Sequence, residues 1–471
     1  MNAGKSLADL GGFLVAPGIA APLDPGFRPA ILARRALEEA ARRSPRAVRV
    51  SLAVEQPAGS TYVRDAWVFS EDTTEALTSY RLCERLIKSM LWSRGGCRVW
   101  VDGPDSLVTW LHRYYDIDAV GSFDAEMMER VYGTPLEVVA APRVAFPASY
   151  NASIALGGHL DGCRIGFDLG ASDRKAAAVI DGEVVFSEEI AWDPSRQSDP
   201  RWHFDQIMDS LQRAAAHLPR VDAIGGSAAG IYVDGEVRFA SLFRSVPPDL
   251  FNSRVRVLFN EIRAAWGEIP FAVANDGDVT ALAGAMYSGS GGILGIAMGS
   301  SEAAGYATRA RGLTGWLNEL AFVPVDYGLD APVDEWSGDR GCGATYFSQQ
   351  SLPRLLPAAG IEVEADAPLP ERLVLLQRLM DAGDERAALV YETIGTHLGY
   401  ALLEYREFYD FDQVLLLGRV MTGQGGEVIR SRSIEVLEAE GSGAAIRFHA
   451  VSEREKRHGQ AVAAASLPSR D

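Results

Sequence analysis

Two segments of the chain share a pattern in which an apolar strand runs directly into a turn of small residues. In the first, a strand over Arg164–Leu169 that carries Asp168 leads into Gly170–Ser172. In the second, a strand over Gly292–Met298 leads into Gly299–Ser301. Small residues allow backbone N–H groups to approach phosphate oxygens closely. Each segment alone is explained equally well as an ordinary strand–turn junction, but the pair is what a phosphate clamp formed by two lobes requires.

Charged and hydroxyl side chains around the first turn suggest how it could bind a nucleotide. Asp168 could hold a metal-bound water, and Ser172 or Lys175 could contact a phosphate. The alternative, that Gly170 merely makes a hairpin turn, is equally compatible with this segment. Neither small-residue turn is a P-loop, because the sequence Gly-Lys-Ser/Thr is absent from both.

A third segment delivers an acid to the end of a strand. The apolar run Phe271–Ala274 is followed by Asn275 and Asp276, and then by a helix of small residues. Sheets of α/β proteins place ligand groups at such strand ends. A sugar hydroxyl is a very weak acid, so a base must accept its proton as the bond to phosphorus forms, and Asp276 suits this role. The alternative is an Asx turn that caps the helix.

A fourth segment, late in the chain, joins the strand Gln413–Leu417 to a glycine-rich turn that contains Gly418 and Gly423. Glycines in this turn would let a flat base lie against the backbone. An ordinary strand–loop–helix junction explains the segment equally well. The order of the four segments along the chain is therefore more informative than any one of them.

The length of 471 residues predicts two or three domains. Residues 1–160 read as an α+β block of unknown role, in which Ala47–Val54 and Tyr62–Phe69 form a hairpin. The remainder alternates strands and helices, which predicts an α/β fold with a first lobe over 161–290 and a second over 291–471, whose last helix packs back on the first. Helices are also expected at Thr74–Trp92, Ser106–Tyr115, Trp202–His217, Ser253–Trp266 and Arg386–Tyr405, strands at Cys97–Asp102, Arg174–Ile180 and Ala223–Gly226, and a hairpin turn at Asp181-Gly182.

Composition narrows the possible partners. The net charge is −18 and no basic cluster stands out, which argues against a nucleic-acid partner. No apolar run approaches the roughly 18 residues of a membrane span, so no membrane partner is expected. The stretch Leu10–Pro22 resembles a signal peptide only faintly, because glycines and prolines interrupt it. The four cysteines form no C-x-x-C pair, so we expect a cytoplasmic protein.

Taken in order, the segments resemble the ROK family of sugar kinases and repressors, within the superfamily of actin, hexokinase and heat-shock chaperones, over roughly residues 163–466. Asp168–Asp173 matches the family's D-x-G-[GA]-[TS]-x-x motif, and Gly225–Gly235 loosely matches its G-x-P-G-x-[VI]-D loop. Asn275–Asp278 is similar to N-D-[AG]-N except at Asp278. The resemblance implies a two-lobed actin-like ATPase core, related to ribonuclease H, with an additional N-terminal α+β region.

The resemblance further implies a kinase that uses ATP and Mg²⁺ to phosphorylate a hexose or N-acetylhexosamine, with a homodimer expected. Asp276 would be the general base, and Asp168 would order the magnesium through water. On this hypothesis the sugar is contacted by Asn275, Glu319, Ser227, Ala229 and Gly230, and the nucleotide or its phosphates by Asp168, Gly170, Ala171, Ser172, Lys175, Gly299, Ser300, Ser301, Gly418 and Gly423.

Several positions depart from the family's motifs. The second phosphate motif, G-T-G-[IV]-G-x-G, is here Gly299–Gly305, and Glu302 within it would repel phosphates unless it holds a metal. The zinc-binding histidine of the family is Phe322, Cys342 alone remains of three cysteines, and Ala344 replaces a glutamate. A structural zinc site needs four nitrogen or sulfur ligands, so no zinc is expected.

These departures leave other functions open. Glu335, Asp339 and Gln349 could replace the lost sugar contacts, although each is more simply a solvated surface group. The altered second phosphate turn favours, as an alternative, a non-catalytic sugar or nucleotide sensor. Such a sensor would lack a DNA-binding domain, because residues 1–160 contain no helix-turn-helix with a basic recognition helix. A third possibility is a scaffold whose N-terminal block mediates assembly.

Overall fold

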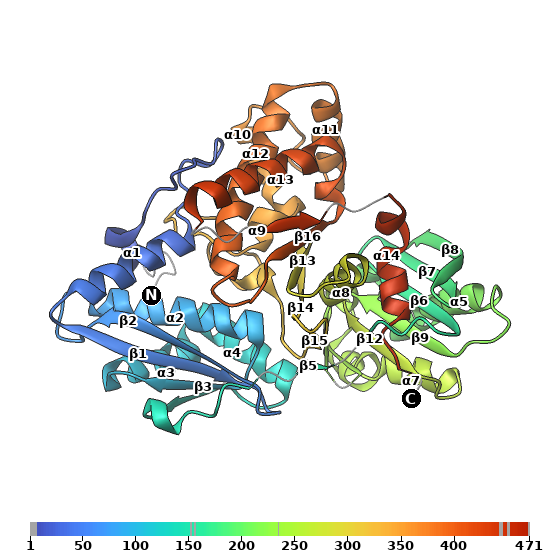
Figure 1. The fold of residues 1–471 in the computed structure, drawn as a ribbon, viewed down its shortest axis with the longest axis horizontal. Helices are drawn as coiled ribbons and strands as arrows, with labels where there is room; N and C mark the ends of the chain where they lie inside the picture. The colour runs from blue at the N-terminus through green and yellow to red at the C-terminus, as the bar shows by residue number, and fades with distance from the viewer. Residues whose placement is uncertain are drawn as a thin grey trace.

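The computed structural model describes residues 7–150, 153–154, 157–233, 235–441, 446–449 and 453–469. Three sheets and one separate hairpin organise these residues, and helices cover the sheets (Figure 1). Helix α8 (Asp276–Ser288) lies near the middle of the molecule in this view, between the sheets of the two lobes. The carboxylate proposed as a base from the sequence, Asp276, begins this helix.

The N-terminal residues form a four-stranded sheet in the order β2-β1-β3-β4. Strands β1 and β2 pair antiparallel, with Ala47 opposite Phe69, which confirms the predicted hairpin. Helix α4 is not indicated by the sequence pattern, and the Asp118 side chain caps it by accepting a hydrogen bond from Val120 N at 3.0 Å. The elements are α1 (Ala30–Arg43), β1 (Ala47–Glu55), β2 (Thr61–Phe69), α2 (Ala76–Arg94), β3 (Arg98–Asp102), α3 (Asp105–Ile117), α4 (Ala119–Tyr132) and β4 (Glu137–Ala140).

The first lobe contains a five-stranded sheet in the order β12-β9-β6-β7-β8. Strands β6, β9 and β12 pair in parallel, so their carboxyl ends lie at one edge. Asp181 and Gly182, with φ of 50° and 85°, form the predicted turn between β7 and β8. The elements are β6 (Cys163–Leu169), β7 (Asp173–Ile180), β8 (Glu183–Ala191), α5 (Pro200–Ala215), β9 (Ala223–Ala228), β10 (Ile231–Val233), β11 (Glu236–Phe239), α6 (Pro248–Leu250), α7 (Leu258–Ala265) and β12 (Phe271–Asn275).

The predicted helix over Ser253–Trp266 is wrong in its first part. A π-helical turn occupies Phe251–Val255, and α7 begins only at Leu258. The π turn buries Phe251 and Val255 together in the core of the first lobe. Packing of these two side chains accompanies the change in helical geometry, which a periodicity of 3.6 residues does not reveal.

The second lobe contains a six-stranded sheet in the order β17-β16-β13-β14-β15-β5. Strands β13 and β16 pair in parallel, so the turns that follow them lie at the same edge. The predicted strand Gln413–Leu417 has the bounds of β16. The elements are β5 (Ser153–Ile154), β13 (Ile293–Met298), β14 (Glu302–Ala307), β15 (Leu313–Thr314), α9 (Ala344–Phe347), α10 (Leu352–Ala358), α11 (Leu369–Asp381), α12 (Glu385–Tyr405), β16 (Gln413–Leu417), α13 (Gly423–Glu440), β17 (Arg447–His449) and, after it, α14 (Glu453–Ala465).

Helices α8 and α14 approach the sheets closely because small residues line the contacts. Helix α8 packs against β13 and β14, and α14 packs against β6, β9 and α8. A Cβ atom at Gly277 would overlap Ala304 O, and one at Gly225 would overlap Ala464 O. The small-residue composition of the helix after Asp276 is therefore explained by its contact with β14.

One hydrophobic core runs from the N-terminal sheet into the second lobe. Leu37 and Trp92 belong to the same cluster of buried side chains as Leu294 and Ile394. A separate cluster that includes Phe167 fills the first lobe. The N-terminal residues thus pack as part of the core of the second lobe. Among the described residues, no helix has both the length and the apolar character needed to cross a membrane.

Candidate functional site

The carboxyl ends of β6 and β9 bring Asp168 and Ser227 together. Asp168 is buried, and its Oδ1 accepts a hydrogen bond from Ser227 Oγ at 2.7 Å. Lys175 lies opposite Asp168 on β7, with its Nζ 3.8 Å from Asp168 Oδ2. Burial raises the pKa of Asp168, and the charge of Lys175 and the hydrogen bond from Ser227 oppose that effect. The Ser227 hydroxyl, expected to contact a sugar, therefore supports Asp168.

The first small-residue turn is in contact with the second lobe through Arg419. Gly170 N donates to Asp173 O at 3.0 Å, which closes the turn. Ser172 Oγ donates to Asp173 Oδ2 at 3.0 Å. From the second lobe, Arg419 Nη2 donates to the same carboxylate oxygen at 3.0 Å and to Ser172 Oγ at 3.3 Å. Because Arg419 directly follows Gly418, the first and fourth segments meet at this point.

The second and fourth turns begin at neighbouring strand ends, after β13 and β16. Gly299 N donates to Ser301 O at 3.0 Å, so the second turn is also closed by its own backbone. Gly418 has a φ of 96°, and a Cβ atom there would overlap Met298 O, so this position requires glycine. Gly423 begins α13, and a helix N-terminus attracts anions. The first, second and fourth segments thus lie together where the two lobes face each other.

Asn275 and Asp276 lie at the start of α8. Asn275 Oδ1 accepts a hydrogen bond from Gly277 N at 2.7 Å, and Asn275 Nδ2 donates to Gly230 O at 2.8 Å. The helix-capping interpretation is therefore confirmed for Asn275, whose amide also holds the backbone at Gly230. Asp276 Oδ1 accepts from Gly277 N at 3.1 Å. Asp276 is partly buried at the carboxyl end of β12.

Burial and mutual repulsion shift the carboxyl groups around Asp276. Burial and the charge of Asp168 raise the pKa of Asp276 to about 7. Burial raises the pKa of Asp278 to about 7, although Asn318 Nδ2 donates to its Oδ1 at 2.8 Å. Burial together with Asp276 and Asp278 raises the pKa of Glu319 to about 8. A carboxyl group with a pKa near neutrality can both accept and release a proton at physiological pH.

Glu302 follows the second turn and is 4% exposed. Its carboxylate lies beside Gly343, and the nearby Tyr405 hydroxyl opposes the rise of its pKa. Burial and the nearby Glu319 raise the pKa of Glu302 to about 8. Below that pH the carboxyl group is mostly neutral, and a neutral Glu302 would not repel a phosphate.

The loop that follows β9 approaches the same acids. Gly230 has a φ of 134°, and a Cβ atom there would overlap Phe239 O. Tyr232 OH donates to Ala229 O at 3.1 Å. Burial is the main cause that raises the pKa of Tyr232, and the negative charges of Asp276 and Glu319 raise it further. The loop carrying Ala229 and Gly230 is thus near both acids, while Asp234, at the end of its motif, lies outside the described residues.

The acidic residues of the site could supply few direct ligands to a magnesium ion. Within the described ranges, no group of three or more His, Cys, Asp or Glu side chains is arranged to hold a metal ion. Magnesium bound with a nucleotide usually keeps several waters and takes one or two carboxylates besides the phosphates. Asp168, a single buried carboxylate beside Lys175, fits a contact made through water.

The residues at the positions of the family's zinc motif form packing contacts and an ion pair. Phe322 packs against Trp92 in a tilted arrangement, with ring centroids 4.2 Å apart. Cys342 is a buried free thiol. Asp339 is also buried and forms an ion pair with Arg85 at 2.7 Å. The interpretation of Asp339 as a solvated surface group is therefore wrong, because cations of the N-terminal block compensate its charge.

Gln349 differs from its expected surface position as well. Its side chain is 2% exposed. Gln349 N donates to Gly299 O at 3.0 Å, so this residue supports the turn that follows β13. Glu335 is exposed, as expected for a solvated group.

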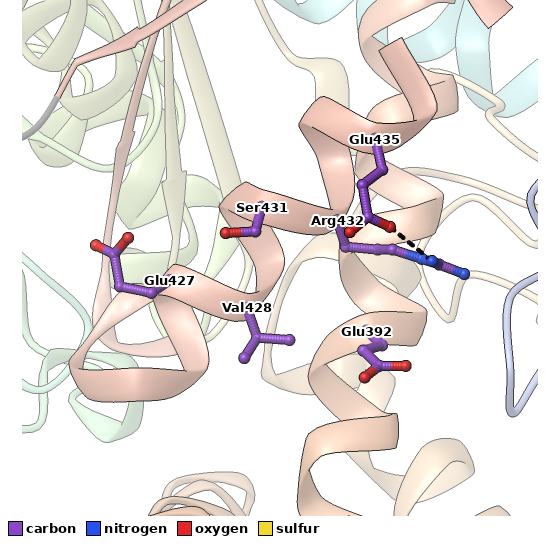
Figure 2. A pocket seen from close by; sticks show the side chains of 6 residues that line it. All are labelled: Glu392, Glu427, Val428, Ser431, Arg432 and Glu435. Carbon is purple, nitrogen blue, oxygen red and sulfur yellow. Dashed lines mark hydrogen bonds and ion pairs between the residues drawn. The ribbon is translucent and has the colours of Figure 1, made fainter. Parts of the chain in front are cut away.

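A surface hollow lies between α12 and α13 (Figure 2). Arg432 in it pairs with Glu435 at 2.7 Å. None of the candidate residues lines the hollow, so the hollow is separate from the candidate active site. Its lining consists of Glu392, Glu427, Val428, Ser431, Arg432 and Glu435.

Arg419 and Tyr232 belong to the site by position, and sequence reasoning missed both. The sequence did contain a pattern that could have identified Arg419, because this residue directly follows Gly418 in the glycine-rich turn. For Tyr232, the only such pattern is its position shortly after Gly230. Its closeness to Asp276 depends on the parallel pairing of β9 with β12.

No protein-family model matches this sequence, and no curated protein matches it. Solved structures do match. A ROK family glucokinase from Streptomyces griseus, in complex with glucose and AMPPNP, is similar over 65% of this chain and 99% of its own, at 20% sequence identity and a TM-score of 0.50. A ROK family transcriptional regulator, a homologue of the E. coli MLC protein, is similar over 64% of this chain and 78% of its own, at 20% identity and a TM-score of 0.50.

These similarities confirm the fold expected from the four segments. The described residues form a two-lobed α/β core like that of these solved structures, with an additional N-terminal region. The match to the glucokinase leaves about a third of this chain without a counterpart. Fold similarity at this level of identity is shared by an enzyme and a regulator, so the function has to be argued from the site.

Proposed function

We propose that this chain is an ATP- and Mg²⁺-dependent carbohydrate kinase of the ROK type, acting on a hexose or an N-acetylhexosamine. The observation that carries the proposal is Asp276. This carboxyl group begins α8 at the carboxyl end of β12, and its pKa is raised to about 7. It belongs to the same part of the molecule as the turns at Gly170 and Gly299, where the two lobes face each other.

Asp276 would act as the general base. The sugar hydroxyl attacks the γ-phosphorus, the bond to the β-phosphate oxygen breaks, and ADP leaves. The hydroxyl proton passes to the Asp276 carboxylate as the new P–O bond forms. Burial beside the negative charge of Asp168 makes Asp276 a stronger base than a carboxylate in water.

The nucleotide would bind across the turns of both lobes. ATP, bound with Mg²⁺, supplies the phosphoryl group, and Asp168 would order the ion through water. Gly170 N and Gly299 N already donate hydrogen bonds within their own turns. The phosphates would therefore accept hydrogen bonds from the backbone amides that follow. The side chains of Lys175 and Arg419 add positive charge nearby. The phosphate amides proposed are those of Ala171, Ser172, Ser300 and Ser301, and Gly418 and Gly423 would lie beside the base.

The sugar would bind on the other side of Asp276. Glu319 would accept hydrogen bonds from its hydroxyls, and the loop with Ala229 and Gly230 would contact it through the backbone. Asn275 holds that loop through Gly230 O, and Ser227 holds Asp168. These two residues would therefore shape the site more than they contact the sugar. A lobe movement that excludes water would limit wasteful hydrolysis of ATP.

The proposal is tested by following ADP formation from ATP and Mg²⁺ with glucose, mannose, N-acetylglucosamine and N-acetylmannosamine. We expect at least one sugar to increase ADP formation well above the rate without sugar. ADP formation that is the same with and without every sugar would contradict the proposal. The four cysteines are free thiols, which suits assay under reducing conditions and a cytoplasmic enzyme.

A non-catalytic sensor is the second candidate. Two observations favour it. Glu302 stands where the family's second phosphate motif has Ile or Val, and a transcriptional regulator shares the fold as closely as the glucokinase does. Calorimetry with ATP and Mg²⁺ separates the candidates. Nucleotide binding in the presence of a sugar supports the kinase, and no nucleotide binding under any sugar condition supports the sensor.

A further inference from the structure

The N-terminal block contacts the segment that carries Glu319 through backbone hydrogen bonds. The amides of Leu317, Asn318 and Glu319 donate to the last carbonyls of α2, at 3.3, 3.0 and 2.9 Å. Carbonyl groups at a helix C-terminus have no partner within the helix. The segment 317–319 supplies these partners, so the end of α2 and the position of Glu319 are fixed together.

Aromatic side chains extend this contact. The ring of Trp92 on α2 lies 4.2 Å from that of Phe322, between centroids, and 6.0 Å from that of Phe123 on α4. Phe123 and Phe322 are themselves 5.8 Å apart. Both neighbouring helices of the N-terminal block therefore pack on the short turn that follows Glu319.

Buried ion pairs fix α2 to the second lobe at another point. Lys88 is fully buried, and its Nζ lies 2.8 Å from Asp124 Oδ1 and 3.2 Å from Asp339 Oδ2. Arg85 pairs with Asp339 at 2.7 Å. Buried charges are strongly destabilising when a partner is missing, so these pairs restrict α2 to one position. Helix α2 is thus held to the second lobe by both its backbone and its charges.

Helix α4 contacts the first lobe beside the other predicted sugar-binding segment. The guanidinium of Arg130 lies 5.2 Å from the ring centroid of Phe239 and 5.0 Å from that of Phe251. Cations at such distances are attracted to aromatic faces. Phe239 ends the hairpin that follows Gly230, and α4 packs against both strands of this hairpin. The same block therefore contacts the Glu319 segment and the Gly230 loop.

We propose that α2 and α4 position the sugar-side groups, with α2 holding Glu319 in the second lobe and α4 holding the β10–β11 hairpin in the first. The N-terminal block would then set the separation of these two groups on either side of Asp276. Arg130 is a positioning residue in this account, because it acts through Phe239. The positioning role adds to the proposed kinase function. Only its kinetic test depends on that function, because hydrogen exchange needs no turnover.

Hydrogen exchange of the full-length protein tests the positioning without any ligand. In Arg130→Ala we expect the amides of β10 and β11 to exchange about three-fold faster, because the cation–π contacts with Phe239 and Phe251 are lost. In Phe123→Leu, which keeps apolar volume but loses the ring, we expect faster exchange at residues 317–319. Arg113→Ala, an exposed position on α3 of the same block, is the matched control and should change neither segment.

The inference is overturned if β10 and β11 exchange as in the wild type when Arg130 is alanine, or if Arg113→Ala has the same effect. Steady-state kinetics adds a second test, because a purely structural role of Arg130 would not change the KM for sugar selectively. With the sugar that gives the highest rate, Arg130→Ala should raise the KM for sugar about three-fold with an unchanged KM for ATP, and Arg130→Lys should restore it. A wild type without turnover contradicts the proposed kinase, whereas the exchange result still decides the positioning.

Discussion

Glu302 shows how one buried carboxyl group links stability to pH. The pKa of Glu302 is raised from 4.5 to about 8 by burial and by Glu319. The folded protein therefore binds this proton more tightly than the unfolded chain does. The stability contributed by protonated Glu302 is fully present below about pH 4.5 and is lost as the pH rises through about 8.

Replacing Glu302 with glutamine should stabilise the protein at high pH. Glutamine has nearly the same shape and no charge to bury, so we expect a gain of about 1 to 3 kcal/mol in the free energy of unfolding at pH 9. At pH 5 the change should be small, because the glutamate is then already neutral. Urea unfolding at both pH values measures this. Glu335→Gln, at an exposed position, is the control; a gain that is equal at pH 5 and pH 9 would contradict the account.

Asp276 should set the pH dependence of the reaction. Its pKa is raised to about 7 by burial and by the charge of Asp168, and a general base must be deprotonated to act. We therefore expect kcat/KM to rise tenfold per pH unit below about pH 7 and to level off above it. Initial rates from pH 5 to pH 9 measure the profile. A flat profile across this range would exclude Asp276 as the titrating base.

At the scale of elements, α8 depends on the cap that Asn275 provides. The Asn275 side chain uses its oxygen to cap the helix and its amide to hold Gly230 O. The two interactions can be separated by substitution, because serine caps a helix well but has no amide to reach Gly230.

Asn275→Ala should lower the free energy of unfolding by about 1 to 2 kcal/mol, since both the cap and the link to Gly230 are lost. Asn275→Ser should lose about half as much. Denaturant unfolding of the two variants and the wild type provides the comparison. Equal losses in both variants would mean that the cap contributes nothing.

Local patterns predict elements well where few neighbouring residues decide the structure. The Asp181-Gly182 turn is predicted because its backbone needs positive φ, and both residues adopt it. The sequence pattern does not predict helix α1, because the helix follows a stretch rich in glycine and proline. A residue distant in the sequence helps to hold this helix in place, since Arg34 pairs with Glu404 at 3.1 Å. The π turn before α7 likewise depends on packing that no local pattern shows.

At the scale of the whole molecule, the N-terminal block and the second lobe share one core. Leu37 and Trp92 pack in the same cluster as Ile394 and Tyr346. Arg34 and Glu404 form a buried ion pair between the same two parts. Separation of the parts would expose apolar surface and leave buried charges without partners.

Residues 1–160 alone should therefore fail to form a stable folded unit. We expect this fragment to aggregate or to lack a cooperative thermal transition, whereas the full chain unfolds cooperatively. Gel filtration and circular dichroism of the fragment and the full chain test the expectation. A monomeric fragment with a sharp transition would contradict it and would favour an independent domain that mediates assembly.

The same distinction separates what the sequence revealed of the site from what it did not. The turns after Asp168 and Met298 and the acid at Asp276 are local patterns, and they lie together because parallel strands end at common edges. Arg419 and Asp173 are 246 residues apart in the sequence, so their contact follows from the fold alone. The contact of α2 with the Glu319 segment is also long-range, so the role proposed for residues 1–160 does not follow from local patterns.

The central claim is that Asp276 accepts the proton of a sugar hydroxyl, and one comparison of variants tests it most directly. Asp276→Asn should lower kcat by about 10²- to 10⁴-fold while calorimetry shows sugar binding close to that of the wild type. Asp278→Asn, the same change two residues along, puts asparagine where the family's motif has it and should keep most of the turnover. Full turnover in Asp276→Asn would contradict the account.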